Sequence, residues 1–507
     1  MANSLQKILV MLPNNLGDVI MATPVLEGIK AKYPGCFCAY FVEDGFDAGI
    51  ENNPYCDEII TFPRKEIKRK LAPGNEEEGI DFLKKILRDI KNKNFNIFIN
   101  LSQHPYVSFI AALIRDKNIT GQHFLKEGNH AVLDEWSQYL YAIAFARRCN
   151  NLHAVDVYRR IAEVKAHKGG YTIQLKDEEK LNARRYLNEK NCDLQKKMML
   201  FQAGAAFSSK RWPVEHFIKL GSRLVSDGWQ IVITGAPSEK DSAMGIQQGI
   251  GQNCIVAAGE TSFRQSMAIC SLAAGCVTGD TAQMHASAGC KVPTYAIFGP
   301  TNPIETGPYG NGHFVFSAHC PDRPCFELEC KTGICMRSVL PETIYACIAN
   351  GDPGDSPRCD VYRTLVEKDG DYRLVAVSRN AYAYFNPVDA YLIKLAFEKN
   401  TGSSNIPQSE FDLSIRETRE WLDDLDAMQK SLENYLKTRD NVAIREFERL
   451  KTSMTRFKGI GEFWTALLNI RLNSVPLIDP NEGIKKSLEA CRETYRQISS
   501  VISHHGL

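Results

Sequence analysis

Short runs of apolar residues recur along the first 300 residues and alternate with stretches that have the spacing of a helix. The run Lys7–Leu12 (KILVML) predicts a strand, and Asp18–Lys32 predicts the helix that follows it and ends before Pro34. Further strands are predicted at Cys36–Val42, Asn96–Leu101, Met198–Gln202, Gln230–Thr234, Cys254–Ala257, Gly275–Thr278 and Thr294–Phe298. Continuous apolar strands that alternate with helices indicate parallel sheets covered on both faces, so the predicted fold class is α/β.

The predicted strands form two series, which divide the chain. The segment Leu175–Lys197 between them is charged, poor in apolar residues and compatible with a helix, so we expect it to lead into an interdomain connection. A cluster of proline and glycine shortly after residue 350 marks a second boundary. We therefore predict domains at 1–175 and 176–350 and an extension at 351–507. Two doubly wound domains that face each other leave a cleft at the carboxyl ends of both sheets, where ligands bind in such folds.

The extension has a different pattern. Tyr372–Val377 and Ala381–Phe385 together predict a small hairpin, and from Ser409 onward the chain is charged and helical. The apolar positions at near-helical spacing are Phe411, Ile415, Trp421, Leu422, Leu425, Met428, Leu432, Tyr435 and Leu436. We expect a helical appendage that packs on itself or on a partner, and a role in recognising an acceptor is the alternative.

Charge and composition exclude some classes of function. Lys plus Arg (61) almost equal Asp plus Glu (60), which argues against a nucleic-acid binder, and an anionic substrate must be bound by a local site. The first residues, Met1–Gln6, lack the pattern of a signal peptide, and no later stretch is long enough to span a membrane. We therefore expect a cytoplasmic protein in which most of the 16 cysteines stay reduced.

The turn after the first predicted strand carries the first candidate for chemistry, Leu16-Gly17-Asp18. Gly17 has no Cβ and lets the backbone approach a ligand closely. Asp18 near the start of a helix is explained by capping or by the helix dipole. The alternative is that its carboxylate accepts a proton from a sugar hydroxyl as a general base.

Two further loops follow strands of the second series. After Met198–Gln202, small residues lead to Ser208, Ser209 and Lys210, a composition suited to binding phosphate through backbone amides and an ammonium group. The segment lacks the Gly-Lys-Ser/Thr end of a P-loop. It can also be read as a surface loop with incidental charges.

After Gly275–Thr278, Asp280 or Thr281 can cap the next helix, and its free amides then point at the cleft. His285 lies four residues beyond Thr281 on a similar face of that helix. We expect a nucleotide contact from the Asp280–Thr281 corner and a structural or substrate-orienting role for His285.

Together these segments resemble glycosyltransferase family nine, the ADP-heptose:lipopolysaccharide heptosyltransferases. The resemblance covers roughly residues 7–345 and rests on several stretches that agree in order and spacing. They are KILVMLPNNLGDVIMATPVLEGIKAKYP, QAGAAFSSKRWPVEHF, ITGAPSEKD, GDTAQMHASAG and AIFGPTNPIETGPYG. It implies the GT-B fold, which has two Rossmann-like domains with the acceptor on the first and the nucleotide-sugar donor on the second, here followed by the mainly helical extension.

The resemblance also implies roles for single residues. Asp18 matches the candidate general base of an inverting displacement, and Lys210 matches the lysine that binds the donor diphosphate. Glu239 matches the acidic residue at the donor ribose. The other donor-side candidates are Ser208, Ser209, Asp280, Thr281 and His285, and the acceptor-side candidates are Asn14, Gly17 and His104. A lysine and helix amides can replace a metal ion, so no cofactor is expected to be required for catalysis.

Four cysteines recur at equal intervals of five residues. They are Cys320, Cys325, Cys330 and Cys335. Four thiolates could hold a structural zinc or iron ion, although the spacing is not that of paired CxxC knuckles. Reduced thiols or oxidisable pairs are the alternative.

The implied reaction moves a heptose from ADP-heptose to a glycan or lipid-linked acceptor, as in lipopolysaccharide core synthesis, with peripheral contact at the inner membrane face. The alternatives are a transferase that uses another nucleotide-sugar donor or a protein acceptor, and a non-catalytic protein that binds carbohydrate or takes part in assembly. The presence of Asp18 together with Lys210 favours catalysis, because a protein that only binds sugar needs no base.

Overall fold

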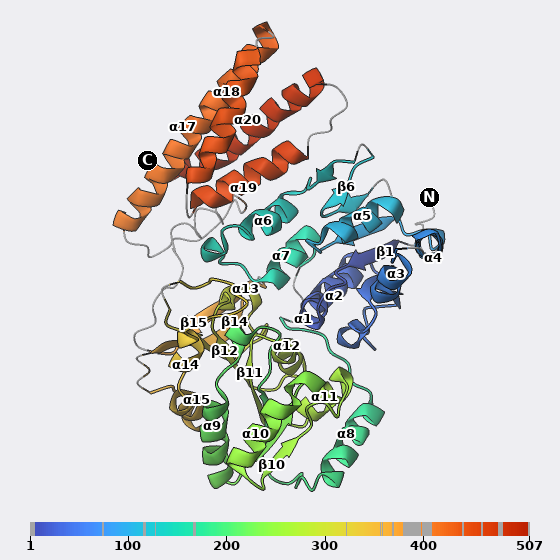
Figure 1. Ribbon diagram of the computed structural model, residues 1–507, viewed down its shortest axis with the longest axis vertical. Helices are drawn as coiled ribbons and strands as arrows, with labels where there is room; N and C mark the ends of the chain where they lie inside the picture. Colours follow the sequence, from blue (N-terminus) through green and yellow to red (C-terminus); the bar gives the residue numbers. More distant parts are fainter. Residues whose placement is uncertain are drawn as a thin grey trace.

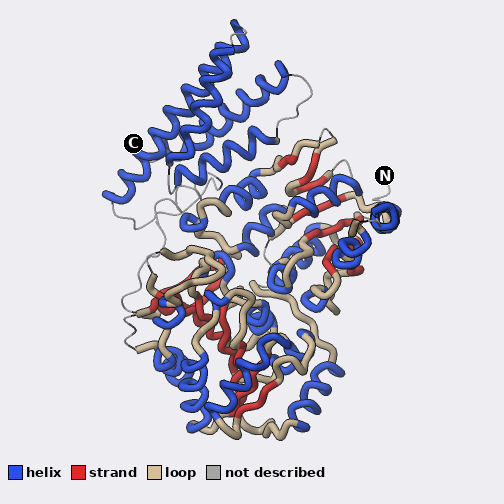
Figure 2. The backbone as a smooth tube through the Cα atoms, viewed as in Figure 1, coloured by secondary structure: helices blue, strands red, loops and turns tan. Residues whose placement is uncertain are grey.

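The computed structural model describes residues 6–378 and 408–504 together with residue 397. Short gaps lie at 74–75, 115–117, 127, 166–168, 321, 355, 357, 368–369, 439–440, 458–459 and 475–479. The described chain forms two sheet-bearing halves and a bundle of long helices beyond the first half (Figures 1 and 2).

The first half is built on a parallel five-stranded sheet. Its strands, in spatial order, are β3 (Glu58–Phe62), β2 (Phe37–Glu43), β1 (Lys7–Met11), β4 (Ile97–Asn100) and β5 (Ile119–Thr120). Within β1, Ile8 and Val10 belong to one buried cluster, and Leu9 and Met11 belong to another. Both faces of the sheet are therefore covered, as the unbroken apolar runs predicted.

Helices cover this sheet, and a two-stranded hairpin lies beside it. The helices are α1 (Leu16–Met21), α2 (Thr23–Lys32), α3 (Arg64–Lys70), α4 (Glu76–Asn92), α5 (Pro105–Ile114), α6 (Glu135–Ile143) and α7 (Ala154–Ile161), and the hairpin is β6 (His123–Phe124) with β7 (His130–Ala131). The predicted helix Asp18–Lys32 is divided in two, because Pro24 has no N–H to donate to the carbonyl of Ile20. The Thr23 hydroxyl donates to that carbonyl instead, at 2.7 Å.

The second half contains an eight-stranded sheet. Its strands, in spatial order, are β10 (Cys254–Val256), β9 (Gln230–Thr234), β8 (Met198–Gln202), β11 (Gly275–Gly279), β12 (Thr294–Phe298), β13 (Phe314–Ala318), β14 (Cys359–Val366) and β15 (Tyr372–Ala376). The first six strands run parallel to one another, and β14 pairs antiparallel with both β13 and β15. Its helices are α8 (Asp177–Glu189), α9 (Val214–Ser226), α10 (Lys240–Ile250), α11 (Phe263–Cys270), α12 (Ala282–Gly289), α13 (Pro303–Thr306), α14 (Ile334–Ser338) and α15 (Pro341–Asn350). The predicted α/β class is confirmed.

β15 has a neighbouring strand that the sequence did not predict. β15 pairs with β14, which precedes it, and β14 pairs with β13, so the sheet continues past residue 350. The proposed second strand, Ala381–Phe385, lies outside the described residues. β14 escaped prediction because its side chains become alternately buried and exposed only toward its end, directly after a segment rich in proline and glycine.

The C-terminal bundle consists of α17 (Gln408–Thr438), α18 (Asn441–Ser453), α19 (Ile460–Asn473) and α20 (Pro480–His504). Among the predicted apolar positions of α17, Ile415, Trp421, Leu425 and Met428 are buried, which confirms the helical prediction from Ser409 onward. The bundle meets the first half where α19 packs along α6 (Figure 1). Within the described part of the chain, we find no helix with the length and apolar character needed to cross a membrane.

Candidate active site

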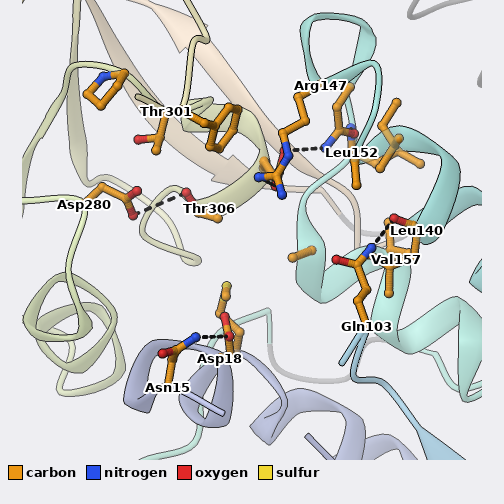
Figure 3. Close-up of a pocket in the computed structure, with 18 of the residues that line it drawn as sticks. Asn15, Asp18, Gln103, Leu140, Arg147, Leu152, Val157, Asp280, Thr301 and Thr306 are labelled. Carbon is orange, nitrogen blue, oxygen red and sulfur yellow. Dashed lines mark hydrogen bonds and ion pairs between the residues drawn. The ribbon is translucent and has the colours of Figure 1, made fainter. Parts of the chain in front are cut away.

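A cavity of about 400 Å³ lies between the two sheet-bearing halves. Its wall from the first half includes Asn15, Asp18, Gln103, Tyr139, Leu140, Ile143, Arg147, Asn150 and Tyr158. Its wall from the second half includes Phe207, Lys210, Asp280, Thr301, Glu305, Thr306, Phe326 and Glu327. Asp18 and Asp280 enter from opposite sides (Figure 3). The structure thus brings Asp18, Lys210 and Asp280, predicted from separate segments, onto one cavity.

Asp18 lies in the first turn of α1, directly after the turn that ends β1. Asn15 adopts a left-handed conformation (φ 63°), and its side-chain amide donates to Asp18 Oδ2 at 3.1 Å. Burial raises the pKa of Asp18 from its ordinary value to about 6, and the nearby Asp280 carboxylate adds to this rise, while Asn15 and Lys210 oppose it. A carboxyl group with this pKa is ionised at neutral pH but holds a proton more readily than an exposed aspartate.

Lys210 and Asp280 form an ion pair at 2.7 Å between Nζ and Oδ2. Lys210 ends a short 3-10 turn after β8, and Asp280 follows β11, so the two residues meet because these strands are neighbours in the sheet. Burial works to raise the pKa of Asp280, but the Lys210 ammonium outweighs it and the pKa is lowered. The Thr306 hydroxyl donates to the other carboxylate oxygen at 3.3 Å.

A second carboxylate of the second half, that of the partly buried Glu305, was not predicted. It accepts from Arg147 Nη1 and from Asn150 Nδ2, both at 3.1 Å, so residues of the two halves meet directly in the cavity wall. Burial raises the pKa of Glu305, and Arg147 opposes this rise. The Arg147 guanidinium also lies 4.1 Å from the centre of the Phe326 ring. Glu305 lies after β12 in a segment rich in glycine and proline. Ligands bind at the carboxyl ends of strands in such folds, so this position could have marked Glu305 as a candidate site residue.

The two predicted serines hold a neighbouring loop. Ser209 is buried and its hydroxyl donates to the carbonyl of Glu327, a residue of the cavity wall. Ser208 is exposed and donates to the carbonyl of Leu328 at 3.4 Å. Neither serine is among the described residues that line the cavity. In this structure they fix the loop beside Lys210.

Glu239 lies outside the cavity, at the carboxyl ends of β8 and β9. Its carboxylate accepts from Gln202 Nε2 at 3.0 Å and from the Ala236 amide at 2.8 Å. A Cβ atom at Gly204 would lie 1.8 Å from the Glu239 carboxyl carbon, so only glycine permits this approach. The arrangement holds the carboxylate against the loop that follows β8.

His285 and Thr281 are also outside the cavity wall as the structure describes it. The His285 ring is buried beneath Gly17, and the Tyr171 hydroxyl lies 2.8 Å from its Nδ1 atom. Burial lowers the pKa of His285 to about 4, so the ring is neutral at neutral pH. The Thr281 hydroxyl is 3.0 Å from that of Thr278. His285 therefore occupies the contact between α1 and α12.

The acceptor-side candidates do not reach the cavity. Gly17 faces His285, and Asn14 donates to Glu43 and to the Tyr106 hydroxyl, at 2.7 and 2.8 Å. His104 is exposed and absent from the wall that the described residues form. The residue next to it, Gln103, lines the cavity instead.

The cysteine quartet is not assembled into a metal site. Among the described residues, which include all four thiols, no group of three or more His, Cys, Asp or Glu side chains is placed to hold a metal ion. Cys335 is buried in the core of the second half, and burial raises the pKa of its thiol. Cys330 is exposed and its sulfur accepts from the Gly333 amide at 3.3 Å. The described side chains therefore do not form the metal site that the spacing suggested.

Comparison with known sequences gives the family. Residues 83–335 match the profile of Glycosyltransferase family 9 (heptosyltransferase). This part of the chain belongs to glycosyltransferase family 9. Lipopolysaccharide heptosyltransferase 1 of Pseudomonas aeruginosa is 23% identical over 64% of this chain and 87% of its own length. Lipooligosaccharide heptosyltransferase 2 of Campylobacter jejuni is 28% identical over 67% of this chain and 96% of its own length.

Solved structures agree in fold. The glycosyl transferase family 9 protein from Veillonella parvula has a TM-score of 0.53 at 24% identity, over 61% of this chain and 86% of its own length. The ADP-heptose lps heptosyltransferase II of E. coli has a TM-score of 0.52 at 18% identity, over 68% of this chain and 97% of its own length. The chain is a glycosyltransferase with the predicted GT-B fold, and its C-terminal helices are additional to that fold.

Proposed function

We propose that this family 9 glycosyltransferase moves a heptose from ADP-heptose to a hydroxyl group of a glycan acceptor, with inversion at the anomeric carbon. The names of its relatives, lipopolysaccharide and lipooligosaccharide heptosyltransferases, support transfer of a heptose and an acceptor of the lipopolysaccharide core. The name of the E. coli ADP-heptose lps heptosyltransferase II supports ADP-heptose as the donor. The observation that carries the proposal is the single cavity shared by Asp18 from the first half and Lys210 from the second.

Asp18 is the general base of this reaction. The acceptor hydroxyl donates its proton to the Asp18 carboxylate while its oxygen attacks the anomeric carbon, and the bond from that carbon to the diphosphate breaks. Burial gives Asp18 a pKa of about 6, so the group is ionised at neutral pH and is more basic than an exposed aspartate. Asp18 belongs to the first half, so the donor can bind at the opposite wall of the cavity, which the second half forms.

Lys210 stabilises the departing diphosphate. Its ammonium lies at the cavity wall in contact with Asp280, and the α12 N-terminus follows directly, with no side-chain cap on its amides. An ammonium and free helix amides can neutralise a diphosphate in a site with few waters, so the step needs no metal ion. Asp280 then accepts from a sugar hydroxyl, and Thr281 contributes to the phosphate site.

The remaining donor candidates act around this centre. We assign Glu239 to the ribose hydroxyls, because its carboxylate is held at the carboxyl ends of two strands in the donor half. Ser208 and Ser209 position the loop that carries Lys210. His285 keeps α1 against α12 and so places Asp18 opposite the donor.

The acceptor that we propose is a lipid-linked glycan at the inner face of the membrane, and the reaction takes place in the cytoplasm. An aromatic stripe on the first half supports peripheral contact with a lipid surface. Its rings follow one another at 5.1–6.1 Å in the order Phe109, Phe124, His130, Tyr141 and Phe145. The two ends of this stripe are exposed, by 52% at Phe109 and 63% at Phe145. Aromatic residues on a surface of this kind are suited to a membrane interface.

Nucleotide binding tests the donor. Thermal unfolding with ADP, UDP or GDP should show stabilisation by ADP at the lowest concentration, since a ligand present at a hundredfold over its Kd stabilises the native state by about 2.7 kcal/mol. Lys210→Gln should lose most of this shift. Lys219→Gln, at an exposed lysine of α9, should keep it. A preference for UDP or GDP would reject ADP-heptose as the donor.

Turnover tests the base. With ADP-heptose and a heptose-deficient lipopolysaccharide, the wild-type enzyme should release ADP, and Asp18→Asn should lower the rate by at least about a hundredfold. ADP binding should persist in this variant, because Asp18 belongs to the opposite half. Substantial activity in Asp18→Asn would show that another group takes the proton.

A further inference from the structure

Helix α6 lies between the cavity and the C-terminal bundle. Leu140 and Ile143 line the cavity, while Trp136 and Tyr139 meet aromatic residues beyond residue 390. The bundle packs on this helix through α19. The short helix α6 therefore lines the active-site cavity and also packs against the C-terminal bundle.

The contact between α6 and the bundle is an aromatic cluster around Tyr139. The Tyr139 ring is fully buried, and its centre lies 5.8 Å from that of Phe463 in α19 and 5.4 Å from that of Phe397. Trp136 lies 5.6 Å from Tyr139 on the same helix. Close ring packing of this kind restricts the orientation of the tyrosine, because a shift of the ring displaces several neighbours.

The hydroxyl of Tyr139 leads back to the cavity. It donates to Asn150 Oδ1 at 2.8 Å, and the Leu152 amide donates to the same oxygen at 3.0 Å. Because a backbone N–H can only donate, the shared atom is the amide oxygen, and the amide nitrogen of Asn150 points the other way. That nitrogen donates to Glu305 Oε2 at 3.1 Å. Hydrogen bonds are thus donated in one direction along this chain, from Tyr139 to Asn150 and from Asn150 to Glu305.

A second contact fastens the same helix to the bundle. Arg471 of α19 is almost completely buried, and its Nε donates to Gln138 of α6 at 2.9 Å. Its two terminal nitrogens donate to Thr494 at 2.9 Å and to Gln497 at 2.6 Å, both in α20. A buried guanidinium requires such partners, so displacement of the bundle from α6 would leave the Arg471 Nε without its partner Gln138.

We propose that the C-terminal bundle is part of the catalytic unit, in which Phe463 holds Tyr139, and Tyr139 positions Glu305 through Asn150. Glu305 presents its carboxylate to hydroxyl groups of the bound acceptor sugar, on the side of the cavity walled by α6. Tyr139 is a positioning residue, because it acts through Asn150. The inference rests on the proposed transfer to a glycan acceptor.

The variant Tyr139→Phe tests this connection, because it removes one hydroxyl and keeps the ring. With ADP-heptose and heptose-deficient lipopolysaccharide, the KM for the acceptor should rise by about threefold to tenfold, the loss expected for one hydrogen bond. The KM for ADP-heptose and the midpoint of thermal unfolding should stay close to wild type. An unchanged acceptor KM would overturn the role of Tyr139.

The role of the bundle needs a matched pair of core variants. Phe463→Ala removes the ring beneath Tyr139, and Phe447→Ala removes a buried ring of α18, elsewhere in the same bundle. Both should lower the unfolding midpoint, but only Phe463→Ala should raise the acceptor KM, and Phe463→Leu should restore part of it. Equal acceptor KM values for the two alanine variants would show that the bundle only contributes stability.

Failure of the proposed function is recognised separately. If the wild-type enzyme does not turn over this acceptor, crystal structures of wild type and Tyr139→Phe still test the connection. The Asn150 amide and the Glu305 carboxylate should then change orientation in the variant. If both stay in place, Tyr139 does not position them and the proposal is wrong whatever the substrate.

Discussion

Asp18 is the proposed general base, so its burial sets the pH range in which we expect this enzyme to work. Its pKa of about 6 exceeds the ordinary value of an aspartate, because burial disfavours the charged form. A general base must be ionised to accept a proton, so we expect kcat/KM to be constant above pH 7. Below pH 6 it should fall by about tenfold for each pH unit, as for one titrating group.

The profile is measured between pH 5 and 8.5, together with ADP binding at each pH. The Lys219→Gln variant, altered on the surface of α9, should give the same curve as wild type. A rate that stays constant down to pH 5 would contradict the pKa assigned to Asp18 or its role as the base.

At the level of single residues, local sequence predicts only part of this site. Asp280 directly follows β11, and Asp18 and Lys210 lie in the segments that follow β1 and β8. Parallel strands bring their carboxyl ends to one edge of a sheet, so a local pattern was enough to select these residues. Arg147 and Asn150 lie in a 3-10 turn and the residues after it, far from any strand. They reach Glu305 only because the two halves pack together, and nothing near them in the sequence indicates that contact.

The contact between α1 and α12 sets the distance across the cavity. A Cβ atom at Gly17 would lie 3.1 Å from His285 Cδ2, and the buried ring is held by Tyr171, so it has little room to yield. Gly17→Ala should push α1 and the adjoining Asp18 away from the donor half. We expect kcat to fall by roughly tenfold to a hundredfold, since a shift of about 1 Å at a reacting group has this effect.

ADP binding should change little in Gly17→Ala, because the proposed donor groups all lie on the second half. The matched control is Gly245→Ala in α10, where an added Cβ meets no atom within 4 Å. Wild-type kcat in Gly17→Ala would show that the helices tolerate the methyl group and that their spacing does not limit the reaction.

Prediction of the elements succeeded where a strand is buried on both faces. Met198–Gln202, Gln230–Thr234 and Thr294–Phe298 were predicted with the bounds that the structure shows, because each is a continuous apolar run. β14 was missed because its side chains alternate between buried and exposed only toward its end, and the pairing of β15 with β14 was not predicted. Which strands pair also depends on which edge of the sheet is free to accept another strand, and the local sequence does not show this.

At the scale of the whole molecule, one arginine joins both halves to the connecting segment. Arg264 of α11 binds the Glu179 carboxylate with two nitrogens, each at 2.7 Å, and donates to the carbonyl of Gln174 at 2.8 Å. Its third nitrogen lies 3.4 and 3.3 Å from the carbonyls of Ala48 and Glu51 in the first half. The planar guanidinium makes these contacts together, and a lysine ammonium cannot reproduce that geometry.

We therefore expect Arg264→Lys to leave the halves less firmly oriented, although the positive charge is kept. Since Asp18 and Lys210 reach the cavity from opposite halves, kcat should fall by roughly tenfold. ADP binding, for which all the proposed groups lie on the second half, should stay within about twofold of wild type. Arg223→Lys, at an exposed position of α9, is the control and should leave kcat unchanged. If Arg264→Lys also turns over at the wild-type rate, the orientation of the halves is set by other contacts, and the pairing of Arg147 with Glu305 becomes the first to examine.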